Sequence, residues 1–72
     1  MATSLQDPKY KAIIDRLKAA RLGRKMNQST LAKRLGKPQS YIAKIEGYER
    51  RLDVLEFVKI ARILKVDASE VL

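Results

Sequence analysis

The stretch LAKRLGKPQSYIAKIEG, residues 31–47, contains two short segments with helical apolar spacing on either side of a Gly-Lys-Pro break. The first segment belongs to a predicted helix over 28–35, and Gly36 can end that helix in a left-handed conformation. Pro38 has a fixed φ that suits the start of a second helix, which we expect to end near Glu46. The stretch therefore predicts two helices joined at a sharp, fixed angle.

Three more helices are predicted on the two sides of this pair. The first covers 8–22, with Asp7 as a possible N-cap and apolar residues in the i, i+3, i+4, i+7 pattern. The next begins after Asp53, which has the spacing of a capping box with Glu56, and a last short turn begins after Asp67 in the same way. The apolar stripe expected on the longer of these two helices comprises Leu55, Val58, Ala61 and Leu64. Since no segment alternates with period two, the expected fold class is all-α, a compact bundle of five short helices.

Length and composition limit what this chain can be. A chain of 72 residues suits one domain, so 1–72 is expected to be a single domain with residues 1–7 as a flexible N-terminus. It contains no cysteine and no histidine, which excludes disulfides and zinc thiolate sites and removes the commonest general base and metal ligand. We therefore expect no enzyme activity, no metal, no cofactor and no small-molecule ligand.

The charge of the chain points to a polyanionic partner. The 16 Lys and Arg residues outnumber the 8 Asp and Glu residues, which gives a net charge of +8. Such a field attracts nucleic acid first and an anionic membrane second. The glycine and proline breaks describe a globule and not one long amphipathic membrane helix, and no apolar run is long enough to span a bilayer. With no signal-peptide pattern at the N-terminus, a cytoplasmic location is expected.

The predicted helix after Pro38 has a polar side suited to DNA. Ile42 and Ile45 define its buried side at about 100° per residue. The opposite side and its flank carry no acid and comprise Gln39, Ser40, Ala43 and Lys44. A slim helix of this kind can enter a major groove about 12 Å wide, where Gln pairs with adenine, Lys donates to guanine and Ser bonds to either. We therefore predict base contacts by Gln39, Ser40 and Lys44.

Several neighbouring residues are candidates for further DNA contacts. Tyr41 lies at the flank of the same helix, where it either fills a gap in the core or reaches DNA, and it is included among the base-contact candidates. The candidates for contacts to phosphates, which fix the register without reading sequence, are Asn27, Lys37, Tyr48, Arg50 and Arg51.

The stretch NQSTLAKRLGKPQSYIAKIEG, residues 27–47, resembles the helix-turn-helix of the Cro and phage-repressor family, also called the XRE type. The matching features are Gln28, Leu31-Ala32, Leu35-Gly36, Gln39, Ile42 and Glu46-Gly47, and the likeness extends over about residues 10–72. The resemblance implies a lambda-repressor-like DNA-binding domain. It also implies that Gln28 meets a phosphate, that Gln39, Ser40 and Lys44 read bases, and that Arg21 and Glu46 form an internal ion pair.

The function implied by this resemblance is sequence-specific regulation of transcription on double-stranded DNA. The expected regulator is a repressor or autoregulator in a bacterial cytosol or nucleoid, and it occupies a palindromic operator as a homodimer, at least on DNA. The apolar C-terminal residues Val66, Val71 and Leu72 either close the core or make the dimer contact. The alternative is a protein-interaction module, in which the same helices bind another protein in the manner of an antitoxin.

Overall fold

The computed structural model describes residues 5–72 and consists of five helices in that part of the chain, with no strand. In chain order these are α1 (Pro8–Gly23), α2 (Gln28–Leu35), α3 (Gln39–Glu46), α4 (Val54–Leu64) and α5 (Ala68–Val71). The prediction of an all-α bundle of five short helices is confirmed. The N-terminus expected to be flexible lies partly outside the described residues, since only 5–7 of its seven residues are described.

The helices begin and end where the capping residues predict. Asp7, Asn27 and Asp53 each accept a hydrogen bond from a backbone N–H in the first turn of α1, α2 and α4. Such side-chain caps satisfy donors that have no partner within a helix. Gly36 ends α2 with a φ of 76°, a left-handed conformation that glycine adopts without a Cβ clash. Pro38 precedes α3 and supplies no side-chain cap.

One of the two expected capping boxes is only half formed. At the start of α5, the Asp67 side chain and the Glu70 side chain bond reciprocally to backbone N–H groups. At the start of α4, Asp53 accepts from the Glu56 N–H at 2.7 Å, but the Glu56 carboxylate turns away from the cap. One of its oxygens lies 3.6 Å from the Lys37 ammonium, so Glu56 connects α4 to the turn between α2 and α3.

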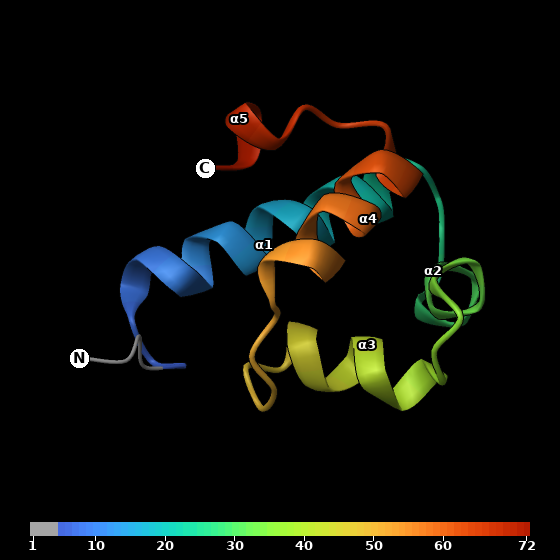
Figure 1. Cartoon of the computed structure of the whole chain (residues 1–72), viewed down its shortest axis with the longest axis horizontal. Coiled ribbons are helices and arrows are strands. Elements are labelled where there is room, and N and C mark those ends of the chain that lie inside the picture. The colour runs from blue at the N-terminus through green and yellow to red at the C-terminus, as the bar shows by residue number, and fades with distance from the viewer. Residues whose placement is uncertain (1–4) are drawn as a thin grey trace.

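The helix pair at 28–46 lies at one side of the molecule. In Figure 1, α3 runs along the lower edge beneath α1 and α4, and α2 meets it at its N-terminal end. The two helices pack on each other more closely than any other pair in the bundle. One long side of α3 therefore faces away from the other helices.

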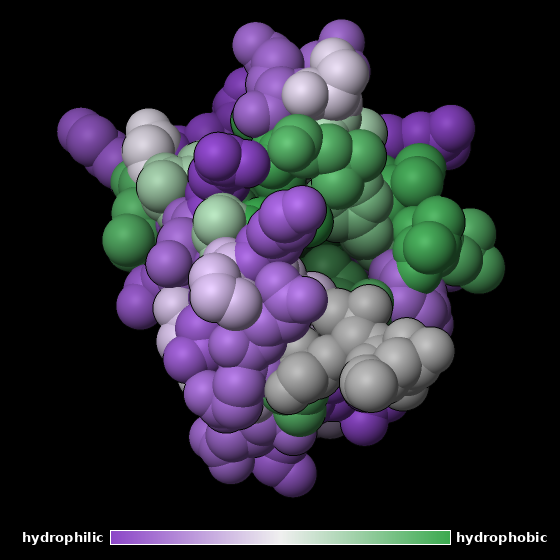
Figure 2. Space-filling model, turned by 90° about the vertical axis from the view of Figure 1, so that its left-hand side faces the viewer, coloured by the Kyte–Doolittle hydropathy of each residue, from purple (hydrophilic) through white to green (hydrophobic). Residues whose placement is uncertain are grey.

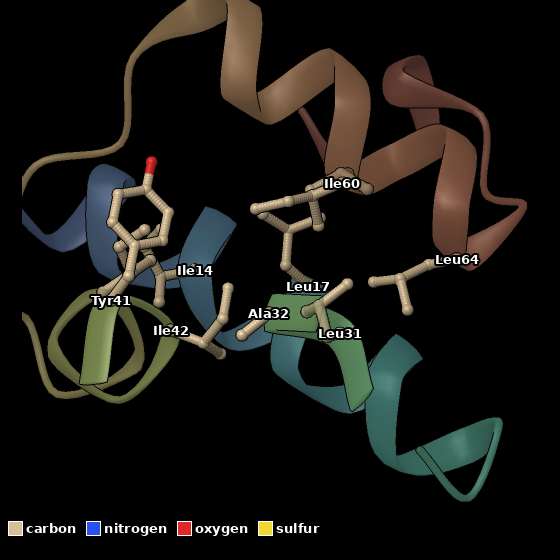
Figure 3. Close-up of a cluster of buried hydrophobic side chains, with 10 residues drawn as sticks. Ile14, Leu17, Leu31, Ala32, Tyr41, Ile42, Ile60 and Leu64 are labelled. Atoms are coloured by element: carbon tan, nitrogen blue, oxygen red, sulfur yellow. The ribbon is translucent and has the colours of Figure 1, made fainter. Parts of the chain in front are cut away.

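The core is a single cluster to which all five helices contribute. Figure 3 shows side chains of α1, α2, α3 and α4 converging between the helices. The most deeply buried large side chains are Ile14, Ile42 and Leu64. Val71 closes the cluster from α5 and Val66 packs against it, which is one of the two roles that the sequence left open for these residues.

The apolar stripe predicted on α4 is wrong at its first position. Leu55 is 63% exposed, and the buried residues of the helix are Ile60, Ala61 and Leu64. Successive residues of a helix are rotated by about 100°, so residues three positions apart point about 60° away from each other. The three such steps from Leu55 to Leu64 add up to about 180°, and these two residues point in opposite directions. Leu55 therefore faces solvent when Leu64 faces the core.

Candidate nucleic-acid interface

The side of α3 that faces away from the bundle is polar and free of acids. Gln39, Ser40 and Lys44 are exposed, as the helical wheel predicts, while Ile42 and Ile45 are 1% and 3% exposed and hold the helix to the core. The two isoleucines fix the rotation of the helix about its own axis. The three polar side chains are consequently presented together on one surface.

Tyr41 does not belong to this exposed surface, and its position matches the core-filling role that the sequence left open for it. The residue is 9% exposed, and its ring lies with the core cluster near Ile14 in Figure 3. The Arg50 guanidinium and the Lys37 ammonium lie over the ring, 4.8 Å and 5.3 Å from its centroid. Tyr41 therefore packs in the core, and its ring supports the side chains of two predicted phosphate contacts, Lys37 and Arg50.

A buried ion pair connects α1 to the end of α3. Arg21 Nε lies 2.7 Å from one carboxylate oxygen of Glu46, and a second guanidinium nitrogen donates to the other oxygen at 2.9 Å. The two side chains are 6% and 8% exposed. The third guanidinium nitrogen donates to the Met26 carbonyl at 2.7 Å, so each of the three nitrogens has an acceptor. Arg21 and Glu46 thus form the internal pair implied by the family resemblance.

Two glutamines extend this pair to the surface of α3. Gln28 Nε2 donates to Glu46 at 3.0 Å, and Gln28 Oε1 accepts from Gln39 Nε2 at 2.7 Å. A continuous chain of hydrogen bonds therefore runs from the buried Arg21 to the exposed Gln39. The predicted phosphate contact Gln28 and the predicted base contact Gln39 are in direct contact, which restricts the rotamers of both.

The remaining phosphate candidates have different surroundings. Asn27 uses its side-chain oxygen to cap α2 at the Thr30 N–H, 2.8 Å away. Arg50 and Arg51 are exposed in the segment between α3 and α4. Lys37 is held by Glu56, as described above, at the turn that precedes α3.

Tyr48 is anchored to α1. Its hydroxyl donates to the Asp15 carboxylate, and the Lys11 ammonium lies 5.0 Å from the centre of its ring. Its φ of 61° is a left-handed conformation that a tyrosine adopts only when other contacts hold it. These contacts direct the hydroxyl of Tyr48 to α1, and the ring fixes the start of the segment that carries the two arginines.

Two tyrosine phenols have raised pKa values for different reasons. Burial, followed by the negative charge of Glu56, raises the pKa of Tyr41 above its ordinary value of 10.0, and Arg50 opposes this effect. The hydrogen bond to Asp15 is the main cause that raises the pKa of Tyr48. In both cases the fold favours the protonated phenol.

The free energy of unfolding is expected to fall at alkaline pH because of these phenols. Since their pKa values are raised in the folded protein, the stabilisation is complete below about pH 10 and is lost as the pH rises toward the folded values. Urea unfolding of the wild type and of Tyr41→Phe, measured at a series of pH values from about 8 to about 11, tests this. The variant should lose less stability over that range, and an identical decline in both proteins would contradict the assignment.

The structure adds contacts that the sequence did not indicate. The Tyr10 ring packs against the core, and its hydroxyl contacts the segment between α3 and α4. No pattern in the sequence links residues so far apart. Within residues 5–72, no helix is long and apolar enough to cross a membrane, and no cluster of acids could hold a metal ion.

Comparison with known proteins gives a family and two similar structures. A helix-turn-helix family model matches residues 17–71. An XRE-family like protein from Pseudomonas syringae pv. tomato str. DC3000 is 43% identical, with a TM-score of 0.82, and the match covers 88% of this chain and 77% of that chain. The restriction-modification controller protein C.AhdI from Aeromonas hydrophila is 25% identical, with a TM-score of 0.79, and the match covers 88% of this chain and 96% of that one. No curated protein matches the sequence.

Proposed function

The chain belongs to the XRE-type helix-turn-helix family, and we propose that it represses or autoregulates transcription by occupying a specific operator. It is a DNA-binding transcriptional regulator and not an enzyme. The observation that carries the proposal is the exposed, acid-free side of α3, which is held in place by Ile42 and Ile45. A helix presented in this way can lie in a major groove and read base edges.

Gln39, Ser40 and Lys44 are the proposed base-reading residues. The bond to Gln28 uses one N–H of the Gln39 amide. The second N–H and the carbonyl oxygen are the two groups that a bidentate contact to adenine requires. Lys44 follows more than one helical turn later on the same side and suits a guanine. Because Gln39 is already restrained by Gln28, less rotamer entropy is lost on binding.

Contacts to phosphates are proposed on both sides of α3. The residues assigned to them are Asn27, Gln28, Lys37, Arg50 and Arg51, and Tyr48 contributes through the segment that it anchors, because its hydroxyl donates to Asp15. They lie before α3, in the turn that leads into it and in the segment that follows it, so together they would hold the helix at both ends. Such contacts set orientation and affinity, while the bases set specificity.

We further propose that the chain acts as a two-fold dimer on DNA. Figure 2 shows hydrophobic side chains gathered on the face that carries the start of α1 and the end of α5. An apolar groove on this side is lined by Tyr10, Ile13, Leu52, Val54, Phe57 and Leu72. Val54 and Leu72 are 80% and 71% exposed and belong to the lining of this groove, so together they form a contiguous apolar patch of the kind that a partner covers. A second copy on this face would supply the second recognition helix, and a palindromic site requires the two helices to lie about 34–36 Å apart.

Residues 1–72 are proposed to work as one domain in a bacterial cytosol or nucleoid, where duplex DNA is accessible. The similarity to a restriction-modification controller makes control of such an operon one possible form of this function. The exposed apolar groove also favours a second candidate, in which the chain binds a different protein through this face. The second candidate predicts that the groove and not α3 determines the partner.

Selection of bound sites from a random pool of duplexes tests the proposed function. We expect an enriched half-site, repeated with two-fold symmetry at a spacing of about one helical turn of DNA. Affinity should fall with salt along a log–log slope of about −0.9 for each neutralised phosphate. Arg51→Ala should weaken binding to all duplexes alike and make this slope shallower by about 1. A pool that yields no enriched sequence would contradict sequence-specific regulation and favour the protein-binding candidate.

A further inference from the structure

The Tyr10 hydroxyl contacts both peptide groups that flank Arg51. It accepts a hydrogen bond from the Leu52 N–H at 2.9 Å and donates to the Arg50 carbonyl at 3.4 Å. Both bonds join α1 to the segment between α3 and α4, across 40 and 42 positions of the chain. One side-chain atom therefore fixes the backbone immediately before and immediately after Arg51.

We infer that Tyr10 is a positioning residue for the contact of Arg51 with the DNA backbone. The inference rests on the proposed function, because it concerns a phosphate contact assigned there. A hydroxyl that holds the Arg50 carbonyl and the Leu52 N–H orders the residue between them before DNA arrives. The entropy of ordering this segment is then lost during folding and not during binding, which favours association.

Other residues fix the two ends of the segment between α3 and α4, and Tyr10 fixes its middle. Its beginning is fixed by Tyr48, whose hydroxyl bonds to Asp15, and its end is fixed by the Asp53 cap at α4. The Arg50 side chain rests on the Tyr41 ring. Arg51 is exposed, and the hydroxyl of Tyr10 bonds to the backbone on each side of it.

Tyr10 is suitable for a conservative test because its ring and its hydroxyl have separate functions. The ring is partly buried, packs against the core and lines the apolar groove with Leu52 and Phe57. Tyr10→Phe keeps this packing and removes only the two hydrogen bonds. The variant is therefore expected to fold, which circular dichroism can establish at the temperature of the binding experiments.

The experiment is a double-mutant cycle on duplex affinity. Wild type, Tyr10→Phe, Arg51→Ala and the double variant are titrated with the selected operator and with an unrelated duplex. Tyr10→Phe should weaken binding to both duplexes about twofold to tenfold. It should have little further effect once Arg51 is alanine, because the residue that it positions is gone.

A second cycle with Lys44→Ala serves as the matched control. Lys44 lies on α3, outside the segment that Tyr10 holds, so the effects of Tyr10→Phe and Lys44→Ala should be additive. An equal loss in the wild-type and Arg51→Ala backgrounds, or no loss in the wild type, would overturn the positioning role. A wild-type protein that binds neither duplex would overturn the proposed function itself, and the first titration reveals that outcome separately.

Discussion

Glu46→Ala is expected to lower the free energy of unfolding by about 3–5 kcal/mol, because it leaves the buried Arg21 guanidinium without its counter-ion. Arg21 is 5% exposed and directs two of its nitrogens at this carboxylate. Gln28 would lose its acceptor at the same time. A domain of this length has a total stability of roughly 4–11 kcal/mol at about 0.05–0.15 kcal/mol per residue. Equilibrium unfolding in urea, followed by circular dichroism, measures the change.

Two further variants separate the charge from the packing. Glu46→Gln keeps the shape and one acceptor, so its loss should be smaller than that of alanine. Replacing both partners, as in Arg21→Met with Glu46→Leu, removes the unpaired charge and should cost less than Glu46→Ala alone. If Glu46→Ala and Glu46→Gln leave the free energy of unfolding unchanged but alter DNA binding, Glu46 contacts DNA and is not structural.

The hydrogen bonds around Glu46 show which contacts could be predicted from the sequence and which could not. The pair with Arg21 follows from resemblance to a family, since nothing in the spacing of the two residues connects them. The bond between Gln28 and Gln39 depends on the angle at which α2 and α3 cross, and a sequence pattern does not determine this angle. The ends of α2 were predicted to the residue because Asn27 and Gly36 act locally, on the backbone next to them.

The burial of Tyr41 and the exposure of Leu55 have different physical origins. Helical spacing shows which residues share a direction but not how far a neighbouring helix extends over their flank. Tyr41 lies about 40° from Ile45 on the wheel, and it is buried because the core continues over that side of α3. Leu55 lies in the first turn of α4, opposite the side that packs, so an apolar residue there faces solvent. The burial of Tyr41 depends on tertiary packing, whereas the exposure of Leu55 follows from the rotation between successive residues of a helix.

Lys44→Ala is expected to reduce affinity for the selected operator by about 1–3 kcal/mol while changing affinity for unrelated duplexes much less. The reason is that a contact to a base edge is made with one sequence only, whereas a contact to phosphate is made with all of them. Lys44 is exposed on the acid-free side of α3, one position before the buried Ile45. Gln39→Ala should act in the same way at a different base pair, because it removes the side chain that Gln28 orients.

The matched control is Lys59→Ala, which removes the same charge from an exposed position on α4, outside the proposed interface. If Lys44 acted only through its charge, the two variants would weaken binding to every duplex to a similar, salt-dependent extent. If Lys44 reads a base, Lys44→Ala loses affinity for the operator only. Repeating the selection with this variant then gives a site that has lost its base preference at one position in each half. Competition titrations with single base-pair variants of the operator distinguish these results, because only a lost base contact makes the variant indifferent to one particular base pair. An unchanged preference at every position would show that Lys44 contributes charge alone, and the reading of sequence would then have to come from Gln39 and Ser40.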